Sequence, residues 1–374
     1  APATSDHIVH LVPSPDQSDI LTYHKADVPE PSGPTMDLTA TNIVIATGAK
    51  PRPLPGNPFA GALIDSTQAL EVNEFPSSAV IIGAGAIALE FASMWNAAGS
   101  KVTLLIRKDR VLSAWDRRAG TTLTRELKRH GVNIITRASV THVDTGANLG
   151  ATVHYTREGQ DGEQSVWGEI ALVAIGRDPI TDPAWGVTID DHGHVATDAY
   201  GRTDKPGVWA VGDVTAGHAL AHRAFEQGIV IAETIAGLNP KPVDEATVPQ
   251  IVFSFPEAAS VGLTVEQAQA REDLVEIKET NYPMLANARM LMSGTAGSLT
   301  IVSGCDAANP DTPRVLGVHM VSPMASDIIA EAEQLVGNHV PLADAARLVH
   351  PHPTFSETLG EALLKADGRP LHTR

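Results

Sequence analysis

Cysteine, aromatic side chains and positive charge are all scarce in this sequence. The single cysteine among 374 residues is Cys305, so the chain can form neither an internal disulfide nor a cysteine-rich zinc site, and we predict no metal site. Acidic residues outnumber lysine and arginine by 44 to 27, for a formal net charge of −17. Nucleic-acid binding depends on clustered positive charge, so the composition argues against a nucleic-acid partner.

Long apolar runs are missing as well. No stretch reaches the roughly 18 to 20 apolar residues that cross a bilayer, and residues 1–6 do not begin a secretion signal. We therefore expect a cytoplasmic protein without a membrane segment. A hydrophobic share of 43% over 374 residues is sufficient for two or three domains with cores of their own.

A glycine-rich turn is the first motif with chemical meaning. Residues 83–88 read GAGAIA, the pattern G-x-G-x-x-A, between a predicted strand at 79–82 and a predicted helix that Gly99 stops. A second strand at 101–106 completes a β-α-β unit. In such a unit the turn and the helix N-terminus receive a pyrophosphate. The context predicts nicotinamide dinucleotide binding, the alternative being a turn that serves packing alone.

The end of the second strand bears on the choice between NAD and NADP. An acidic residue there would accept hydrogen bonds from the ribose of NAD, but this sequence has Ile106 followed by Arg107 and Lys108. Positive charge at this place suits the 2′-phosphate of NADP. Because basic residues after a strand are often merely solvated, we leave NAD and NADP both open.

The remaining pattern predicts two kinds of fold. Residues 1–40 are polar and proline-rich and do not resemble an independent domain. Before residue 246, further strands are predicted at 20–23, 43–46, 134–135, 151–155, 170–175 and 208–211, with a helix at 219–235. After it, strands at 248–253, 298–302 and 315–321 precede helices at 325–336 and 342–348. Strands followed by grouped helices indicate a separate α+β domain.

Five motifs in a fixed order identify a resemblance. They are TNIVIATG at 41–48, GAGAIALE at 83–90, AIGRDP at 174–179, AVGD at 210–213 and HPHPTFSE at 350–357. The chain resembles the pyridine nucleotide-disulfide oxidoreductases over nearly its whole length. The resemblance implies an α/β protein with Rossmann-like FAD and NAD(P) domains and a C-terminal α+β dimerisation domain. It assigns residues 1–72 and 196–245 to FAD, 73–195 to NAD(P) and 246–374 to a homodimer interface.

The resemblance also implies which residues act. His352 would be a base that serves the partner subunit's site, with Glu357 orienting its ring, and His350 would support them. Asp213 would hold the flavin side chain, although a helix N-cap is the ordinary alternative for such an aspartate. The implied cofactor contacts are Thr47, Gly48, Ala49, Gly83, Ala84, Gly85, Ala86, Ile87, Ala88, Leu89, Glu90, Ile106, Arg107, Val140, Gly176, Asp213, Ala219, Leu220, Ala221 and His222.

Two branches of the family are similar to different parts of the chain. The C-terminal motif and residues 219–228 are most similar to the dihydrolipoamide dehydrogenases, whereas Ile106 and Arg107 are more similar to the NADPH-using glutathione reductases. The first branch implies a dithiol substrate, FAD, NAD(P) and a 2-oxo acid dehydrogenase complex as a partner. The second implies an NADPH-dependent reductase of another disulfide, of the glutathione type.

Family members begin with a flavin-binding G-x-G-x-x-G turn and a helix with two redox cysteines. Neither occurs here, and Cys305 is expected in a polar loop without a catalytic role. We therefore expect this chain to be a fragment of a longer enzyme and to be inactive by itself. The alternatives are a non-catalytic, nicotinamide-binding remnant and one half of a split enzyme.

Overall fold

The computed structural model describes residues 7–11, 36–146 and 150–373. These form two compact units: the described residues up to Lys50 with Asp178–Val243, and Pro51–Arg177 with the residues from Asp244 onward. The strand predicted at 20–23 lies outside the described residues. Within the described part of the chain, no helix has both the length and the apolar character needed to cross a membrane.

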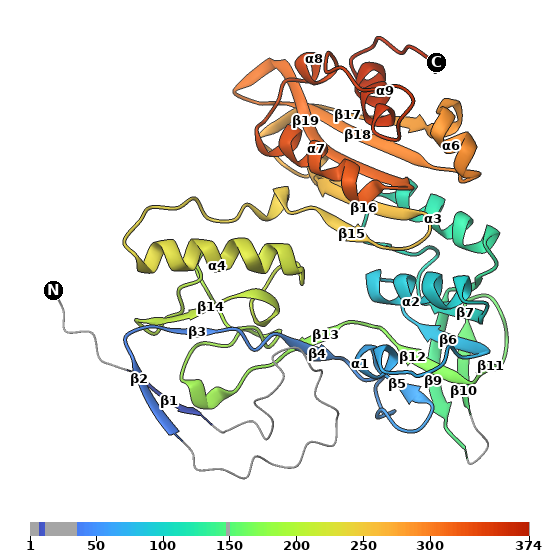
Figure 1. Cartoon of the computed structure of the whole chain (residues 1–374), viewed down its shortest axis with the longest axis vertical. Helices are drawn as coiled ribbons and strands as arrows, with labels where there is room; N and C mark the ends of the chain where they lie inside the picture. The colour runs from blue at the N-terminus through green and yellow to red at the C-terminus, as the bar shows by residue number, and fades with distance from the viewer. Residues whose placement is uncertain (1–6, 12–35, 147–149, 374) are drawn as a thin grey trace. The chain divides into compact units, whose positions relative to one another are not determined.

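The first unit contains a parallel strand pair followed by a long helix (Figure 1). Strand β3 (Ile43–Ile45) pairs in parallel with β14 (Val208–Ala210), and helix α4 (Ala221–Ile235) follows. Because the strands are parallel, the segments after both strands lie at the same edge of the sheet. The other elements are β1 (His7–Leu11) and β2 (Met36–Ala40), which pair antiparallel, and the 3-10 turns η1 (Pro183–Trp185) and η2 (Gly212–Val214).

The second unit begins with a five-stranded parallel sheet. Its strand order is β5-β12-β6-β7-β8. The bounds are β5 (Leu63–Ile64), β12 (Ile170–Val173), β6 (Ser78–Ile82), β7 (Lys101–Ile106) and β8 (Asn133–Thr136), with helices α1 (Ser66–Leu70), α2 (Ala86–Ala97) and α3 (Arg117–Arg129). The predicted β-α-β unit is therefore confirmed, and Gly99, at φ +97°, follows the end of its helix. Strands β4 (Ala49–Pro51) and β13 (Arg177–Pro179) form a separate pair.

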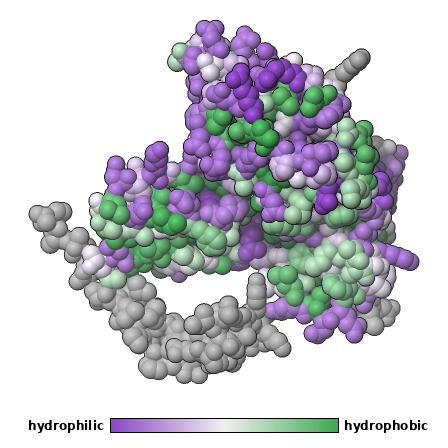
Figure 2. Space-filling model, turned by 45° about the horizontal axis from the view of Figure 1, so that its top comes forward, coloured by the Kyte–Doolittle hydropathy of each residue, from purple (hydrophilic) through white to green (hydrophobic). Residues whose placement is uncertain are grey.

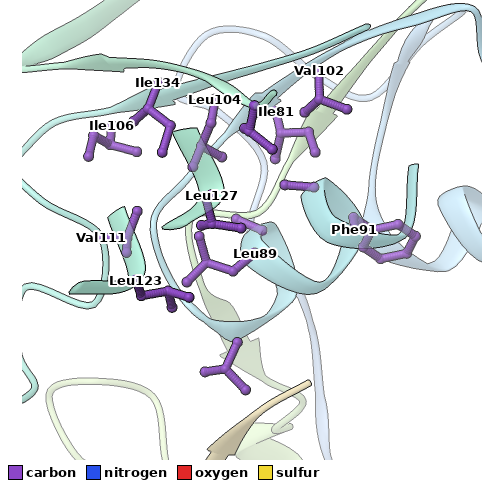
Figure 3. Packing of buried hydrophobic residues seen from close by; sticks show 14 of the residues in the cluster. Ile81, Leu89, Phe91, Val102, Leu104, Ile106, Val111, Leu123, Leu127 and Ile134 are labelled. Carbon is purple, nitrogen blue, oxygen red and sulfur yellow. The ribbon is translucent and has the colours of Figure 1, made fainter. Parts of the chain in front are cut away.

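Helices α2 and α3 pack on this sheet through a dense apolar core (Figure 3). Leu89 of α2 and Leu123 of α3 are completely buried with Leu104 and Ile106 of β7. A second core, which includes Val80 and Leu105, packs against a three-stranded antiparallel sheet. That sheet has the order β11-β10-β9 and consists of β9 (Ala138–Asp144), β10 (Ala151–Arg157) and β11 (Gln164–Gly168).

The rest of the second unit is an antiparallel sheet with helices packed on it. The strand order is β15-β16-β19-β18-β17, and helices α7 and α9 share its core. The strands are β15 (Gln250–Val252), β16 (Glu257–Gly262), β17 (Leu274–Pro283), β18 (Ser298–Asp306) and β19 (Asn309–Ser322). The helices are α5 (Val265–Gln269), α6 (Ala288–Ser293), α7 (Ala325–Gly337), α8 (Leu342–Ala345) and α9 (Glu357–Ala366), with 3-10 turns η3 (Glu245–Thr247) and η4 (Met284–Ala286).

Several sequence-based placements were wrong. Cys305 lies in β18, where it is 2% exposed, rather than in a polar loop. Helix α3 was missed because its sequence RRAGTTLTRELKR contains glycine and three threonines, which are weak helix formers. Gly120 is needed there because a Cβ atom would lie 2.6 Å from the Val111 carbonyl oxygen. Strands β9, β11, β16 and β17 were also missed, and the helix predicted at 342–348 ends at Ala345.

Candidate active site and cofactor sites

His352 and Glu357 form a hydrogen-bonded pair in the C-terminal part of the chain. Nδ1 of His352 lies 2.8 Å from Oε2 of Glu357, the first residue of α9. The histidine side chain is 75% exposed, whereas the carboxylate is only 15% exposed. When Nδ1–H of His352 donates a hydrogen bond to Glu357, Nε2 is left as the free basic nitrogen facing solvent. The pair can therefore accept a proton from a molecule outside this chain.

Asn287 holds the carboxylate of this pair in place. Its Nδ2 donates to Oε1 of Glu357 at 2.7 Å and to the Thr354 carbonyl oxygen at 3.0 Å. Asn287 is 4% exposed and is also the N-cap of α6. The Thr354 hydroxyl in turn accepts from the Glu357 backbone N–H at 3.2 Å. The sequence analysis missed Asn287, which lies 70 positions before Glu357 and carries no local signal for this contact.

His350 has a different environment from His352. Its Nε2 lies 2.9 Å from Oε1 of Glu331 on α7, and its side chain is 9% exposed. The hydrogen bond to Glu331, together with the charge of that residue, raises the pKa of His350 against the opposing effect of burial. The close fit requires Gly360 of α9, because a Cβ atom there would lie 2.4 Å from Nδ1 of His350. His350 thereby ties the loop that carries His352 to α7 and α9.

Of the two glycines in the turn between β6 and α2, only Gly85 leaves open space beside the backbone. Gly83 has φ +145°, and a Cβ atom there would lie 2.1 Å from the Ala174 carbonyl oxygen. At Gly85, the N-cap of α2, no atom lies within 4 Å of a Cβ position, and no side chain caps the helix. The first N–H groups of a helix have no partner within the helix. This open N-terminus therefore fits the pyrophosphate of a dinucleotide.

Other predicted nicotinamide contacts differ in exposure. Ala88 and Leu89 are fully buried in the core beneath the turn, and so is Ile106 at the end of β7. Arg107, the next residue, is exposed, so the charge at this strand end is positive. Oε1 of Glu90 accepts from the Phe253 backbone N–H at 3.0 Å, and burial raises the pKa of Glu90.

Five more predicted nicotinamide contacts complete the set. Val140 in β9 is partly buried against the second core. Gly176 has φ +135° and lies near the Arg52 guanidinium. Ala84 in the turn and Ala86 and Ile87 at the start of α2 are all partly buried.

The predicted flavin contacts lie in the first unit, at the carboxyl ends of β3 and β14. Thr47 follows β3 and donates its hydroxyl proton to the Ile180 carbonyl oxygen at 2.7 Å, and Gly48 has φ +69°. Asp213 lies in η2, directly after β14. Residues 219–222 lead into α4, whose N-cap Leu220 makes no side-chain cap. Ligands of parallel sheets bind at this edge, so the arrangement fits a flavin. Ala49 begins β4, Ala221 and His222 begin α4, and Ala219 shortly precedes α4.

Cys305 has the surroundings of an inert thiol. Burial and the neighbouring Glu276 raise the pKa of Cys305. Thiol exchange needs the thiolate form, so a buried thiol with a raised pKa is poorly suited to it. Cys305 is also the one cysteine of the chain.

Comparison with known proteins agrees with this arrangement. The pyridine nucleotide-disulphide oxidoreductase domain matches residues 14–228, and the dimerisation domain of the same proteins matches residues 248–363. The chain belongs to the pyridine nucleotide-disulphide oxidoreductase family. The resemblance found in the sequence is therefore confirmed, together with the α/β fold and its dimerisation domain.

Named members of the family include several dihydrolipoyl dehydrogenases. The enzyme of Cupriavidus necator is 38% identical over 341 residues, which cover 90% of this chain and 70% of that enzyme. One from Bacillus subtilis is 37% identical over 341 residues, with the same coverage. Among solved structures, LpdA from Mycobacterium tuberculosis has a TM-score of 0.78 at 28% identity, covering 89% of this chain and 71% of LpdA.

A second solved member is a disulfide reductase. The HOCl-induced flavoprotein disulfide reductase RclA from Escherichia coli has a TM-score of 0.77 at 26% identity, covering 88% of this chain and 74% of RclA. As a member of this family, the chain is a flavin-dependent oxidoreductase of the FAD and NAD(P) type. Its C-terminal part is a dimerisation domain, which supports a homodimer.

Proposed function

We propose that the protein transfers electrons between a dithiol, dihydrolipoamide, and NAD(P), with His352 as the base for the dithiol. The observation that carries the proposal is the His352–Glu357 hydrogen bond of 2.8 Å, which leaves the second ring nitrogen exposed. The dihydrolipoyl dehydrogenases at 37 and 38% identity support the choice of dithiol.

His352 acts on the proton of the substrate thiol. Thiol–disulfide exchange proceeds through a thiolate. Nε2 of His352 takes the proton of the substrate thiol, and the resulting thiolate is the nucleophile that attacks the redox disulfide. The positive charge that then forms on the ring is stabilised by Glu357, which Asn287 holds in position. His352 performs this step in the site of the partner subunit.

The proposed cofactor residues are those that the family resemblance implies. The flavin would be held by Thr47, Gly48, Ala49, Asp213 and residues 219–222. When bound, it would supply two-electron exchange between the dithiol and the nicotinamide. The nicotinamide cofactor would be bound by residues 83–90, by Ile106 and Arg107 at the end of β7, and by Val140 and Gly176. This proposal keeps the division into residues 1–72 with 196–245 for FAD, 73–195 for NAD(P) and 246–374 for the dimer. The open backbone at Gly85 supports the nicotinamide assignment.

The setting of the enzyme is part of the same proposal. We place it in the cytoplasm, as a partner of a 2-oxo acid dehydrogenase complex. The redox cysteine pair comes from outside these 374 residues, since Cys305 is buried and single. We therefore expect the isolated chain not to reduce NAD(P) with dihydrolipoamide, and turnover by that chain would contradict this part.

The test is a steady-state assay of the protein purified from its own cells. Wild-type protein should oxidise dihydrolipoamide with NAD+ or NADP+, and His352→Gln should lower kcat by ~10²- to 10⁴-fold. His372→Gln is a matched control, because His372 is also exposed and lies 2.8 Å from a carboxylate, that of Glu361. Unchanged turnover in His352→Gln would overturn the proposed role.

A second candidate is an NADPH-dependent reductase of another disulfide, of the glutathione type. It is favoured by the exposed Arg107 and Lys108 after β7, which suit a 2′-phosphate. The same preparation distinguishes the two candidates. Faster reduction of a glutathione-type disulfide with NADPH than oxidation of dihydrolipoamide would select the reductase.

A further inference from the structure

Strands β9, β10 and β11 form one antiparallel sheet (Figure 1). Two histidines and two carboxylates lie close together on and beside it. His142 of β9 and His154 of β10 are direct partners in the register, and the pairing then skips Thr141. Directly opposed residues have Cβ atoms about 4.5 to 5.5 Å apart, and here the two rings stack with centroids 4.1 Å apart and planes 7° apart. Asp144 lies two residues after His142 on β9, and Glu163 directly precedes β11.

The two imidazole rings have the same orientation. Nε2 of His154 and Nε2 of His142 lie 3.1 and 3.9 Å from Oδ2 of Asp144. The Nδ1 atoms of the same rings lie 3.7 and 3.8 Å from the Glu163 carboxylate. One carboxylate is therefore beside both Nε2 atoms and the other is beside both Nδ1 atoms.

We propose that His142, His154 and Asp144 bind one divalent transition-metal ion, of which Zn²⁺ is representative. Their ligand atoms lie within 4.8 Å of one another. Zinc bonds of about 2.0 to 2.2 Å place tetrahedral ligand atoms roughly 3.3 Å apart. The side chains are 46% (His142), 22% (His154) and 65% (Asp144) exposed, so they have room to rotate. The two rings must tilt out of their parallel stack for both Nε2 lone pairs to converge on one ion.

Glu163 supplies the support that metal-binding histidines usually have. A histidine that binds a metal through one nitrogen commonly donates the other N–H to a carboxylate, which orients the ring and fixes its tautomer. Glu163 lies 3.7 and 3.8 Å from the two Nδ1 atoms, too far for hydrogen bonds as they stand but close enough to accept from a ring that moves toward it. The Thr141 hydroxyl donates to its Oε1 at 2.7 Å.

The ligand types define the class of metal. Imidazole nitrogen suits Zn²⁺, Ni²⁺, Co²⁺ and Cu²⁺, whereas Mg²⁺ and Ca²⁺ prefer oxygen ligands alone. Three protein ligands leave at least one position for water. The ion would join β9, which carries His142 and Asp144, to β10, which carries His154. This proposal departs from the sequence-based expectation of no metal, since that expectation considered cysteine and could not see pairing between strands.

The test is a Zn²⁺ titration of the whole metal-free chain in competition with a chromophoric chelator, together with Co²⁺ absorption spectra. We expect one tight equivalent, with affinity reduced at least ~10-fold in His154→Ala and in Asp144→Asn. Glu163→Gln should weaken binding while keeping the stoichiometry. His372→Gln, which alters an exposed histidine beside Glu361, should bind as the wild type does.

Two results would overturn the site. One is the absence of saturable Zn²⁺ binding in the wild type. The other is an unchanged first equivalent in the double variant His142→Ala/His154→Ala. Circular dichroism verifies that each variant is folded, and Asp144→Asn preserves the shape of the side chain. Because the readout is metal affinity, its failure is independent of the proposed dithiol chemistry.

Discussion

Three histidines of the dimerisation domain show how surroundings decide the chemistry of one residue type. His319 is 1% exposed, with Ser260 Oγ at 2.7 Å and the Leu263 carbonyl oxygen at 3.1 Å from its two ring nitrogens. Burial lowers the pKa of His319, which favours the neutral ring. His350 is hydrogen-bonded to Glu331, and its pKa is raised. His352 alone of the three presents a ring nitrogen to solvent beside a carboxylate.

The raised pKa of His350 predicts a pH-dependent stability. A histidine with a higher pKa in the folded state stabilises the fold fully below its unfolded pKa of about 6.5. That contribution is lost as the pH rises through the folded pKa. Glu331→Gln should therefore lower the urea midpoint of unfolding more at pH ~6 than at pH ~9, on either side of the ordinary histidine pKa.

Urea unfolding followed by circular dichroism measures this difference. Glu333→Gln is the control, because Glu333 lies on the same helix and its carboxylate accepts from Gln334. The same loss of midpoint at both pH values for Glu331→Gln would refute the role of the His350–Glu331 pair.

Some residue contacts were predictable and others were not. The pairing of His352 with Glu357 lies within one motif of eight residues, and the 2.8 Å hydrogen bond between them is local in sequence. Asn287 and Glu331 could not be predicted, because α6 and α7 lie far from the motif along the chain. Only the packing of those helices brings their polar groups to the loop.

At the scale of elements, the turn before α2 contains two glycines, and a different physical reason explains why each position is glycine. Gly83 is required by the fold, because its φ is +145° and a Cβ atom would collide with the Ala174 carbonyl group. Gly85 has an extended backbone with φ −91° and open space around its Cβ position. The fold therefore tolerates a side chain at Gly85, and a ligand at the helix N-terminus is the reason to expect glycine there.

The two glycines give a matched pair of variants. Gly83→Ala should destabilise the chain by at least about 2 kcal/mol, through backbone strain and the close contact. Gly85→Ala should keep the wild-type thermal midpoint but weaken NAD(P)H binding about 10-fold or more, since a methyl group would occupy the space nearest the pyrophosphate. Thermal unfolding and a fluorescence titration with NADH and NADPH measure these effects. Wild-type affinity in Gly85→Ala would place the pyrophosphate elsewhere.

At the scale of the whole molecule, the surface around His352 is suited to a second subunit. Leu291 and Met292 of α6 are 68% and 74% exposed, and Val349 before the His352 loop is 95% exposed. Arg289 of α6 lies over the Phe355 ring at 5.3 Å, so α6 and this loop are neighbours. On the face of the molecule that it draws, Figure 2 shows apolar side chains in green among polar ones in purple. Large exposed apolar side chains that lie together commonly mark an interface.

This surface predicts the effect of introducing charge. The double variant Leu291→Asp/Val349→Asp should shift the protein from dimer to monomer, because it would bury two unpaired carboxylates. Leu70→Asp, at a site 62% exposed at the end of α1, is the control and should remain dimeric. Sedimentation velocity measures the species. Retention of the dimer in the double variant would exclude this surface as the interface.

The sequence by itself determined the family, the glycine turn and the His352–Glu357 motif, because each depends on residue types within a few positions of one another. Only the tertiary structure decided that Cys305 is buried in a strand, that Asn287 supports Glu357, and that His142 stacks on His154. These contacts depend on strand register and helix packing. A shift of one residue between β9 and β10 would separate the two histidines, and no local pattern encodes that register.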